Sequence, residues 1–148
     1  GEYTLPEGFR YAPLSAVTVR LASSLAPFSH RAGALDISVK SVDGAPIGSA
    51  TLLLTVEPDR ALLWDEQYVT RHSGDGRASV RRTREGHLWL RLNGSGRTGS
   101  TSLSTQVPWR LAPGADGPVK IRVSQSLATA PHGIPLDSNP EPSTLRLP

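Results

Sequence analysis

Short stretches of alternating apolar and polar residues, broken by turn residues about every ten positions, constrain the fold of this chain most. Residues 35–40 show the pattern clearly, because leucine, isoleucine and valine alternate there with aspartate, serine and lysine. Dipeptides such as Asp43-Gly44 and Glu85-Gly86 separate the stretches, and glycine supplies the positive φ that tight turns need. The spacing predicts an all-β chain, an antiparallel β-sandwich of seven to nine strands with little helix.

The same alternation indicates where the strands lie and which way their side chains face. The segment 51–56 is almost continuously apolar, so it is either buried on both faces or central in the sandwich. Residues 87–93 form a hairpin with the preceding strand, with alternate leucines directed inward and Trp89 outward. Residues 61–70 read as one bulged strand or two short ones. The remaining strands are expected at 16–21, 35–40, 77–82, 101–107 and 119–123.

The chain of 148 residues has the length of one domain with appendages. We expect an irregular N-terminal segment at 1–13, a β-sandwich domain at 14–125 and a proline-rich tail or linker at 126–148. Five prolines lie in the last 20 residues, and proline cannot donate to a sheet ladder. This tail is therefore predicted to be an extended linker, a segment along a sheet edge or disordered. The absence of an initiator methionine suggests a fragment of a larger protein.

Composition and motifs argue against several kinds of chemistry. The chain has no cysteine, which excludes a disulfide scaffold, a thiol nucleophile and a zinc–thiolate site. The four histidines have no metal-ligand spacing, and the Gly-x-Gly-x-x-Gly at 94–99 leads into a strand rather than the helix that dinucleotide binding needs. No apolar run approaches the ~20 residues that span a bilayer. We expect no enzyme activity, no cofactor, no metal and no membrane insertion.

Arginine dominates the basic residues, with 14 arginines and two lysines in a chain of net charge +3. Half of the arginines lie between Arg71 and Arg97. The main interpretation places them on the solvent faces of two strands, and the alternative is a patch for an anionic glycan or a phospholipid surface. A modest net charge does not favour a nucleic-acid partner.

Trp89 is the candidate centre of a binding surface, since the inward leucines around it leave it on the outer face of its strand. Tryptophan and arginine are enriched at binding hot spots, so an exposed tryptophan beside arginine can bind a sugar ring or a protein. The alternative is that the C-terminal tail or a neighbouring domain covers Trp89. The candidate binding residues are Trp89, Arg91, Arg82 and Arg84.

A family resemblance rests on the runs V-D-G-A-P-I-G-S-A-T-L-L-L, T-R-H-S-G-D-G-R-A-S-V and E-G-H-L-W-L-R-L. These resemble bacterial immunoglobulin-like repeats of the invasin type and prealbumin-like repeats of surface adhesins. The resemblance implies an immunoglobulin-like or prealbumin-like sandwich in a secreted or cell-surface protein. It also implies a non-catalytic role in adhesion, spacing or partner binding, with a protein or glycan ligand on a cell surface and neighbouring domains of the same polypeptide as partners.

Two other functions remain open from the sequence. One is a carbohydrate-binding accessory module that uses Trp89, and the other is a projection domain of a viral capsid or spike.

Overall fold

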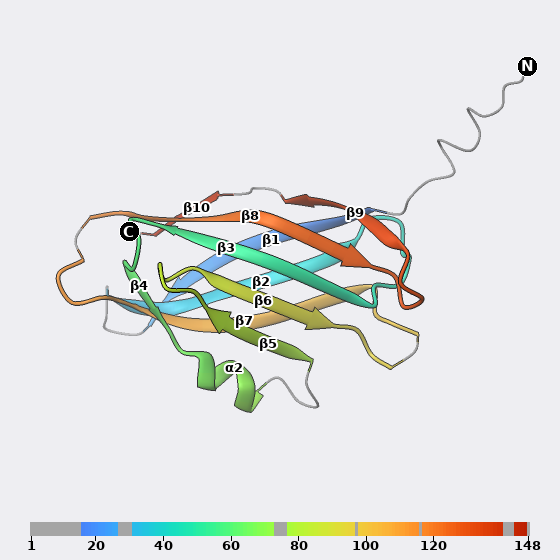
Figure 1. Cartoon of the computed structure of the whole chain (residues 1–148), viewed down its shortest axis with the longest axis horizontal. Coiled ribbons are helices and arrows are strands. Elements are labelled where there is room, and N and C mark those ends of the chain that lie inside the picture. Colours follow the sequence, from blue (N-terminus) through green and yellow to red (C-terminus); the bar gives the residue numbers. More distant parts are fainter. Residues whose placement is uncertain are drawn as a thin grey trace, which may run out of the picture.

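The computed structural model describes residues 16–26, 31–72, 77–96, 98–115, 117–140 and 144–147. The predicted irregular segment 1–13 lies outside the described residues, and so does Gly76, which the sequence also predicts to be a turn residue. Two layers of strands face each other across a common core (Figure 1). This arrangement confirms the predicted all-β sandwich, but the described residues form ten strands and not the predicted seven to nine.

Each layer follows from antiparallel pairing of neighbouring strands, apart from one parallel pair at an edge. The first layer has the order β4 (Leu62–Trp64), β7 (Ser102–Leu111), β2 (Ala32–Ser41), β1 (Ala16–Leu25) and β9 (Pro135–Pro140). The second has the order β5 (Ala78–Arg82), β6 (Leu88–Asn93), β3 (Ser49–Glu57) and β8 (Val119–Thr129), with β10 (Thr144–Leu147) paired to β8.

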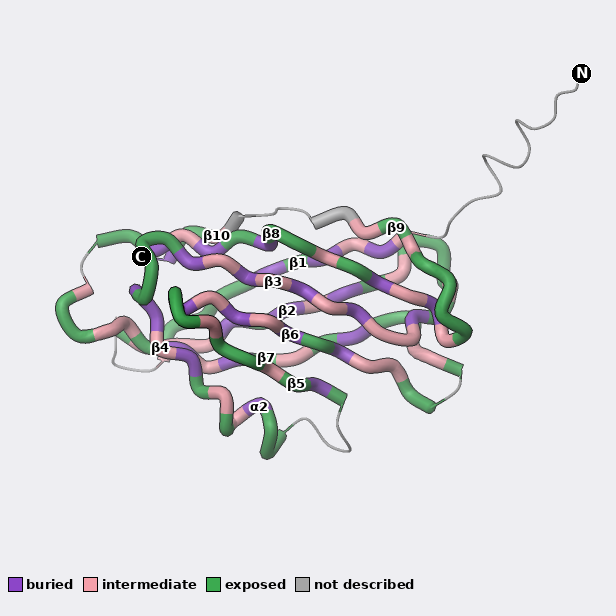
Figure 2. The backbone as a smooth tube through the Cα atoms, in the orientation of Figure 1, coloured by how far each residue is buried: buried purple, intermediate pink, exposed green. Residues whose placement is uncertain are grey.

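The core lies between the two layers and is built from the alternate positions that the sequence predicted. Buried and more exposed residues succeed each other along almost every strand (Figure 2). Strand β3 is central in its layer, between β6 and β8, and is covered on one face only. The largest fully buried side chains come from both layers and include Leu35, Ile37, Leu52, Leu54, Leu88, Leu90, Leu92, Ile121 and Leu147.

The strand predicted at 67–70 is wrong, because these residues belong to the helix α2 (Glu66–His72). Asp65 caps this helix, since its Oδ1 accepts a 3.0 Å hydrogen bond from the backbone N–H of Tyr68. Val69 is buried, and the helix packs against β5 and β7 at one side of the sandwich. Within the described part of the chain, no helix has the length and hydropathy to cross a membrane.

The proline-rich C-terminal segment contributes strands to the sandwich. Strand β9 pairs with β8 through Leu136 and then runs parallel to β1, so it joins the two layers at one edge. Strand β10 returns to β8, and its Leu147 is fully buried. The boundary expected at residue 125 falls inside β8, which runs to Thr129.

Candidate functional site

The outward-facing side chains of β5, β6, β3 and β8 form a continuous surface, which we call the outer face. Register places Trp89 between Arg81 on β5 and Leu53 on β3, with Gln125 of β8 beyond Leu53. The next row contains Ser79, Arg91, Thr51 and Leu127. The outer face therefore has an apolar centre, formed by one leucine on β3, one leucine on β8 and the tryptophan of β6.

Leu127 is the most exposed member of this apolar centre, with 57% of its surface accessible. Leu53 and Trp89 are half-buried because they pack against their neighbours on adjacent strands. A β-bulge between Leu53 and Leu54 shifts the register against β8, where Ser124 donates a 3.3 Å hydrogen bond to the carbonyl of Leu53. The bulge sets which residues of β8 lie beside the apolar centre.

The outer face is strongly basic. Arg81, Arg91 and Arg122 are exposed, and Lys120 is half-buried. Within β5, β6, β3 and β8, the single carboxylate is Glu57, which lies opposite Lys120 at the end of β3. An acidic partner is therefore complementary to this surface, and a basic one is repelled.

The structure separates the four binding residues predicted from the sequence. Arg91 shares the outer face with Trp89, as predicted from their spacing of two. Arg82 pairs with Leu88 and so lies on the opposite side of β5 from Arg81. Its guanidinium faces Glu66 of α2, with 3.7 Å between Arg82 Nε and Glu66 Oε1.

Arg84 occupies the turn between β5 and β6, away from the apolar centre. The arginines that do surround that centre, Arg81 and Arg122, were missed. Their positions depend on the register with Trp89 and Thr55 in the neighbouring strands.

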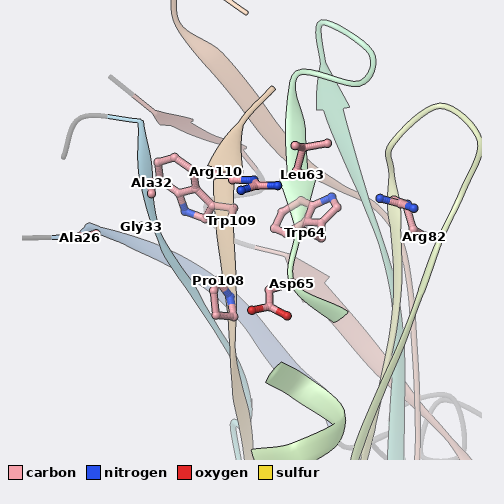
Figure 3. A pocket seen from close by; sticks show the side chains of 10 residues that line it. All are labelled: Ala26, Ala32, Gly33, Leu63, Trp64, Asp65, Arg82, Pro108, Trp109 and Arg110. Atoms are coloured by element: carbon pink, nitrogen blue, oxygen red, sulfur yellow. The ribbon is translucent and has the colours of Figure 1, made fainter. Parts of the chain in front are cut away.

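A second candidate site lies at the side of the sandwich between β4 and the β5–β6 hairpin. Two adjoining hollows of about 650 and 500 Å³ share Leu63 and Arg82 in their walls. Figure 3 shows the larger hollow, with the guanidinium groups of Arg82 and Arg110 directed toward it and Trp64 between them. The smaller one is lined by Arg60 and Arg84, among others. We call the two hollows together the arginine groove.

Two tryptophans that face each other in register, Trp64 on β4 and Trp109 on β7, line the larger hollow. Both are almost completely buried. Trp109 fits because residue 33 is glycine: a Cβ there would lie 2.8 Å from Trp109 Cζ2. The Nε1 of Trp64 donates to the carbonyl of Gly86, whereas the buried Nε1 of Trp109 has no partner among the residues that the structure describes.

Among the titratable groups near these surfaces, Glu85 has a shifted pKa. The pKa of Glu85, in the exposed β5–β6 turn, lies below its ordinary value, first because a backbone hydrogen bond of Glu85 stabilises the carboxylate and second because Thr83 does so. In the ranges that the structure describes, no three histidine, aspartate or glutamate side chains gather as metal ligands would. Among the described residues, neither surface therefore presents a cluster of metal ligands.

Comparison with solved structures identifies the same fold in cohesin modules. The non-cellulosomal cohesin of Archaeoglobus fulgidus has a TM-score of 0.59 at 12% identity, over 84% of this chain and 86% of that chain. A cohesin module of a family 33 glycoside hydrolase from Clostridium perfringens has a TM-score of 0.59 at 13% identity, over 91% and 96%. A cohesin in a type I cohesin–dockerin complex from Clostridium thermocellum reaches 0.61 at 6% identity, over 84% and 94%.

These similarities establish a cohesin-like β-sandwich fold. No family model matches the sequence, and no curated protein matches it either.

Proposed function

We propose that this chain is a non-catalytic protein-binding module that docks an acidic partner on the outer face. The observation that carries the proposal is the apolar centre of Leu53, Trp89 and Leu127 on an open sheet, with exposed arginines on the same face of β5, β6 and β8. Aromatic and arginine side chains are enriched in protein interfaces, and a central apolar cluster with a charged rim is their usual arrangement.

The chemistry of the outer face also favours a protein over a small molecule. Small-molecule sites are concave, whereas this surface is one side of a four-stranded sheet. The apolar centre supplies the burial that favours association, and the arginines select an acidic partner and speed its approach. We expect association to slow as salt rises, because exposed charges are screened.

The partner class to test first is a dockerin module, since structures of this fold include a cohesin bound to a dockerin. A cohesin-like module within a larger secreted or cell-surface protein would hold its partner at that surface. The roles in adhesion and spacing implied by the invasin-type resemblance are compatible with the same outer face.

A binding screen with purified dockerin modules tests the proposal, using calorimetry at low and moderate salt. The double variant Trp89→Ala/Arg91→Ala is expected to weaken binding at least ~10-fold, and a melting curve verifies that it remains folded without the half-buried Trp89 side chain. The control Arg20→Ala/Lys40→Ala removes two exposed cations, one more than the test variant, from the outside of the other layer and should bind as the wild type does. Failure of every dockerin to bind would reject the partner class, and equal loss in both variants would reject the outer face.

A further inference from the structure

The arginine groove is distinct from the outer face, because its residues lie on the other side of β5 and on the edge strand of the other layer. Its two hollows share Leu63 and Arg82, so they adjoin along β4. The cations around them come from three separate parts of the fold. Arg60 follows β3, Arg110 belongs to β7, and Arg82 and Arg84 belong to the β5–β6 hairpin.

The basic charge of the groove is only partly neutralised. Arg60 Nε donates a 3.1 Å hydrogen bond to the carbonyl of Arg84, which orients Arg60 without cancelling its charge. Glu66 faces Arg82 at 3.7 Å. The guanidinium groups of Arg84 and Arg110 form neither a hydrogen bond nor an ion pair with any residue that the structure describes.

The nearby carboxylates already have partners, two of them at the groove itself, where Glu66 faces Arg82 and Glu85 interacts electrostatically with Arg84. Asp65, which lines the larger hollow, accepts the Tyr68 N–H at the start of α2. Glu66 also accepts a 3.3 Å hydrogen bond from the backbone N–H of Arg82. Exposed, planar guanidinium groups spaced along a groove bind sulfate and carboxylate groups well, because each can donate two parallel hydrogen bonds.

From these observations we infer that the arginine groove binds a segment of an acidic polysaccharide that carries sulfate or uronate groups. An acidic peptide fits less well. A peptide would need an apolar anchor site there, but the Leu62 and Trp64 side chains of β4 are 1% and 5% exposed. A polar chain with repeated negative charges is complementary to the arginines along the groove. This ligand is independent of the protein partner proposed for the outer face.

The test is a titration of the purified protein with three probes at 50 and 150 mM salt. The probes are a size-defined heparin oligosaccharide, an oligogalacturonate of similar length and a neutral cello-oligosaccharide. We expect one or both anionic probes to bind and the neutral probe not to bind. A poly-glutamate peptide serves as competitor, and it should displace the bound oligosaccharide poorly.

Two triple variants with the same change in net charge locate the site. Arg82→Ala/Arg84→Ala/Arg110→Ala is expected to weaken binding of the anionic oligosaccharide about 10-fold or more. The control Arg20→Ala/Lys40→Ala/Arg146→Ala removes three exposed cations from other surfaces and should change binding less than about 3-fold. All six positions are exposed, and a melting curve verifies that both variants fold.

Three outcomes would overturn the inference. The first is no binding of either anionic probe by the wild-type protein at 50 mM salt. The second is an equal loss in the two triple variants, which would indicate non-specific attraction by net charge. The third is displacement by poly-glutamate as effective as displacement by unlabelled oligosaccharide, which would assign the groove to an acidic protein segment.

Discussion

The indole Nε1 of Trp64 donates a buried 3.0 Å hydrogen bond to the backbone carbonyl of Gly86. Trp64 belongs to the edge strand of one layer, and Gly86 lies in the β5–β6 turn of the other. The bond therefore links the two layers at one side of the sandwich, and its two residues line the arginine groove. Arg60 strengthens the same junction, because its backbone N–H donates a 2.8 Å hydrogen bond to the carbonyl of Glu85.

Replacing Trp64 by phenylalanine is expected to destabilise the protein more than Trp109→Phe does. Both changes remove similar volume from buried, paired positions, but only the first leaves a buried carbonyl without its donor. An unsatisfied buried acceptor costs about 1–3 kcal/mol, and the two variants should differ by that amount. Urea unfolding followed by circular dichroism measures the difference, and equal stabilities would contradict the role of the Trp64 bond.

Glycines 86 and 44 form a second matched pair, because both have φ of +85°. At Gly44 an added Cβ meets nothing within 4 Å. Alanine there should lower the free energy of unfolding only through the strain of its left-handed backbone, by about 1–2 kcal/mol. At Gly86 the Cβ would also lie 2.9 Å from Arg60 Cα, so we expect a further loss of about 1–3 kcal/mol. Thermal unfolding of Gly86→Ala and Gly44→Ala compares them, and an equal drop would show that the turn relaxes without cost.

The C-terminal strand is expected to contribute to stability through Leu147, which is fully buried. Leu147→Ala should cost about 2–5 kcal/mol, the usual range for deleting a buried leucine side chain. Leu127→Ala is the control, since Leu127 is 57% exposed and its change should stay within about 0.5 kcal/mol. If denaturant unfolding showed the two variants to be equally stable, β10 would not be an integral part of the fold.

The carboxyl group of Glu85 is expected to titrate below its ordinary value of 4.5. Because the folded pKa is lowered, the carboxylate contributes stability that is complete above the unfolded pKa and is lost as pH falls through the folded pKa. Carbon-detected NMR titration measures this pKa, and Thr83→Val should move it upward because Thr83 stabilises the charged form. A value at or above 4.5 in the wild-type protein would disprove the expectation.

The candidate site was only partly predictable from the sequence. The spacing of two between Trp89 and Arg91 is a local property, so their common face followed directly from strand periodicity. The position of Arg82 depends on how β5 pairs with β6, and that register puts Arg81 beside Trp89. A register shift of one residue exchanges the two faces of a strand. Without the register, the sequence therefore does not determine whether Arg81 or Arg82 lies on the same face as Trp89.

The helix α2 shows a similar limit. Its Tyr68, Val69 and Thr70 favour strands by propensity, and the sequence predicted a strand there. The structure instead has a cap by Asp65 and a contact of Glu66 with Arg82, which lies far along the chain. Asp65 can be read from the sequence as a capping residue. The helix it caps also depends on packing against β5 and β7, which only the tertiary structure brings beside it.

Alternation of apolar and polar residues by itself determined that this chain is an all-β sandwich and which residues of most strands face the core. The periodicity has this power because side chains of a strand alternate between its two faces. Only the tertiary structure decided that the proline-rich end forms β9 and β10, and that the arginines divide between the outer face and the groove. Pairing partners are distant in sequence, so edge strands and groove walls are defined only when the layers assemble.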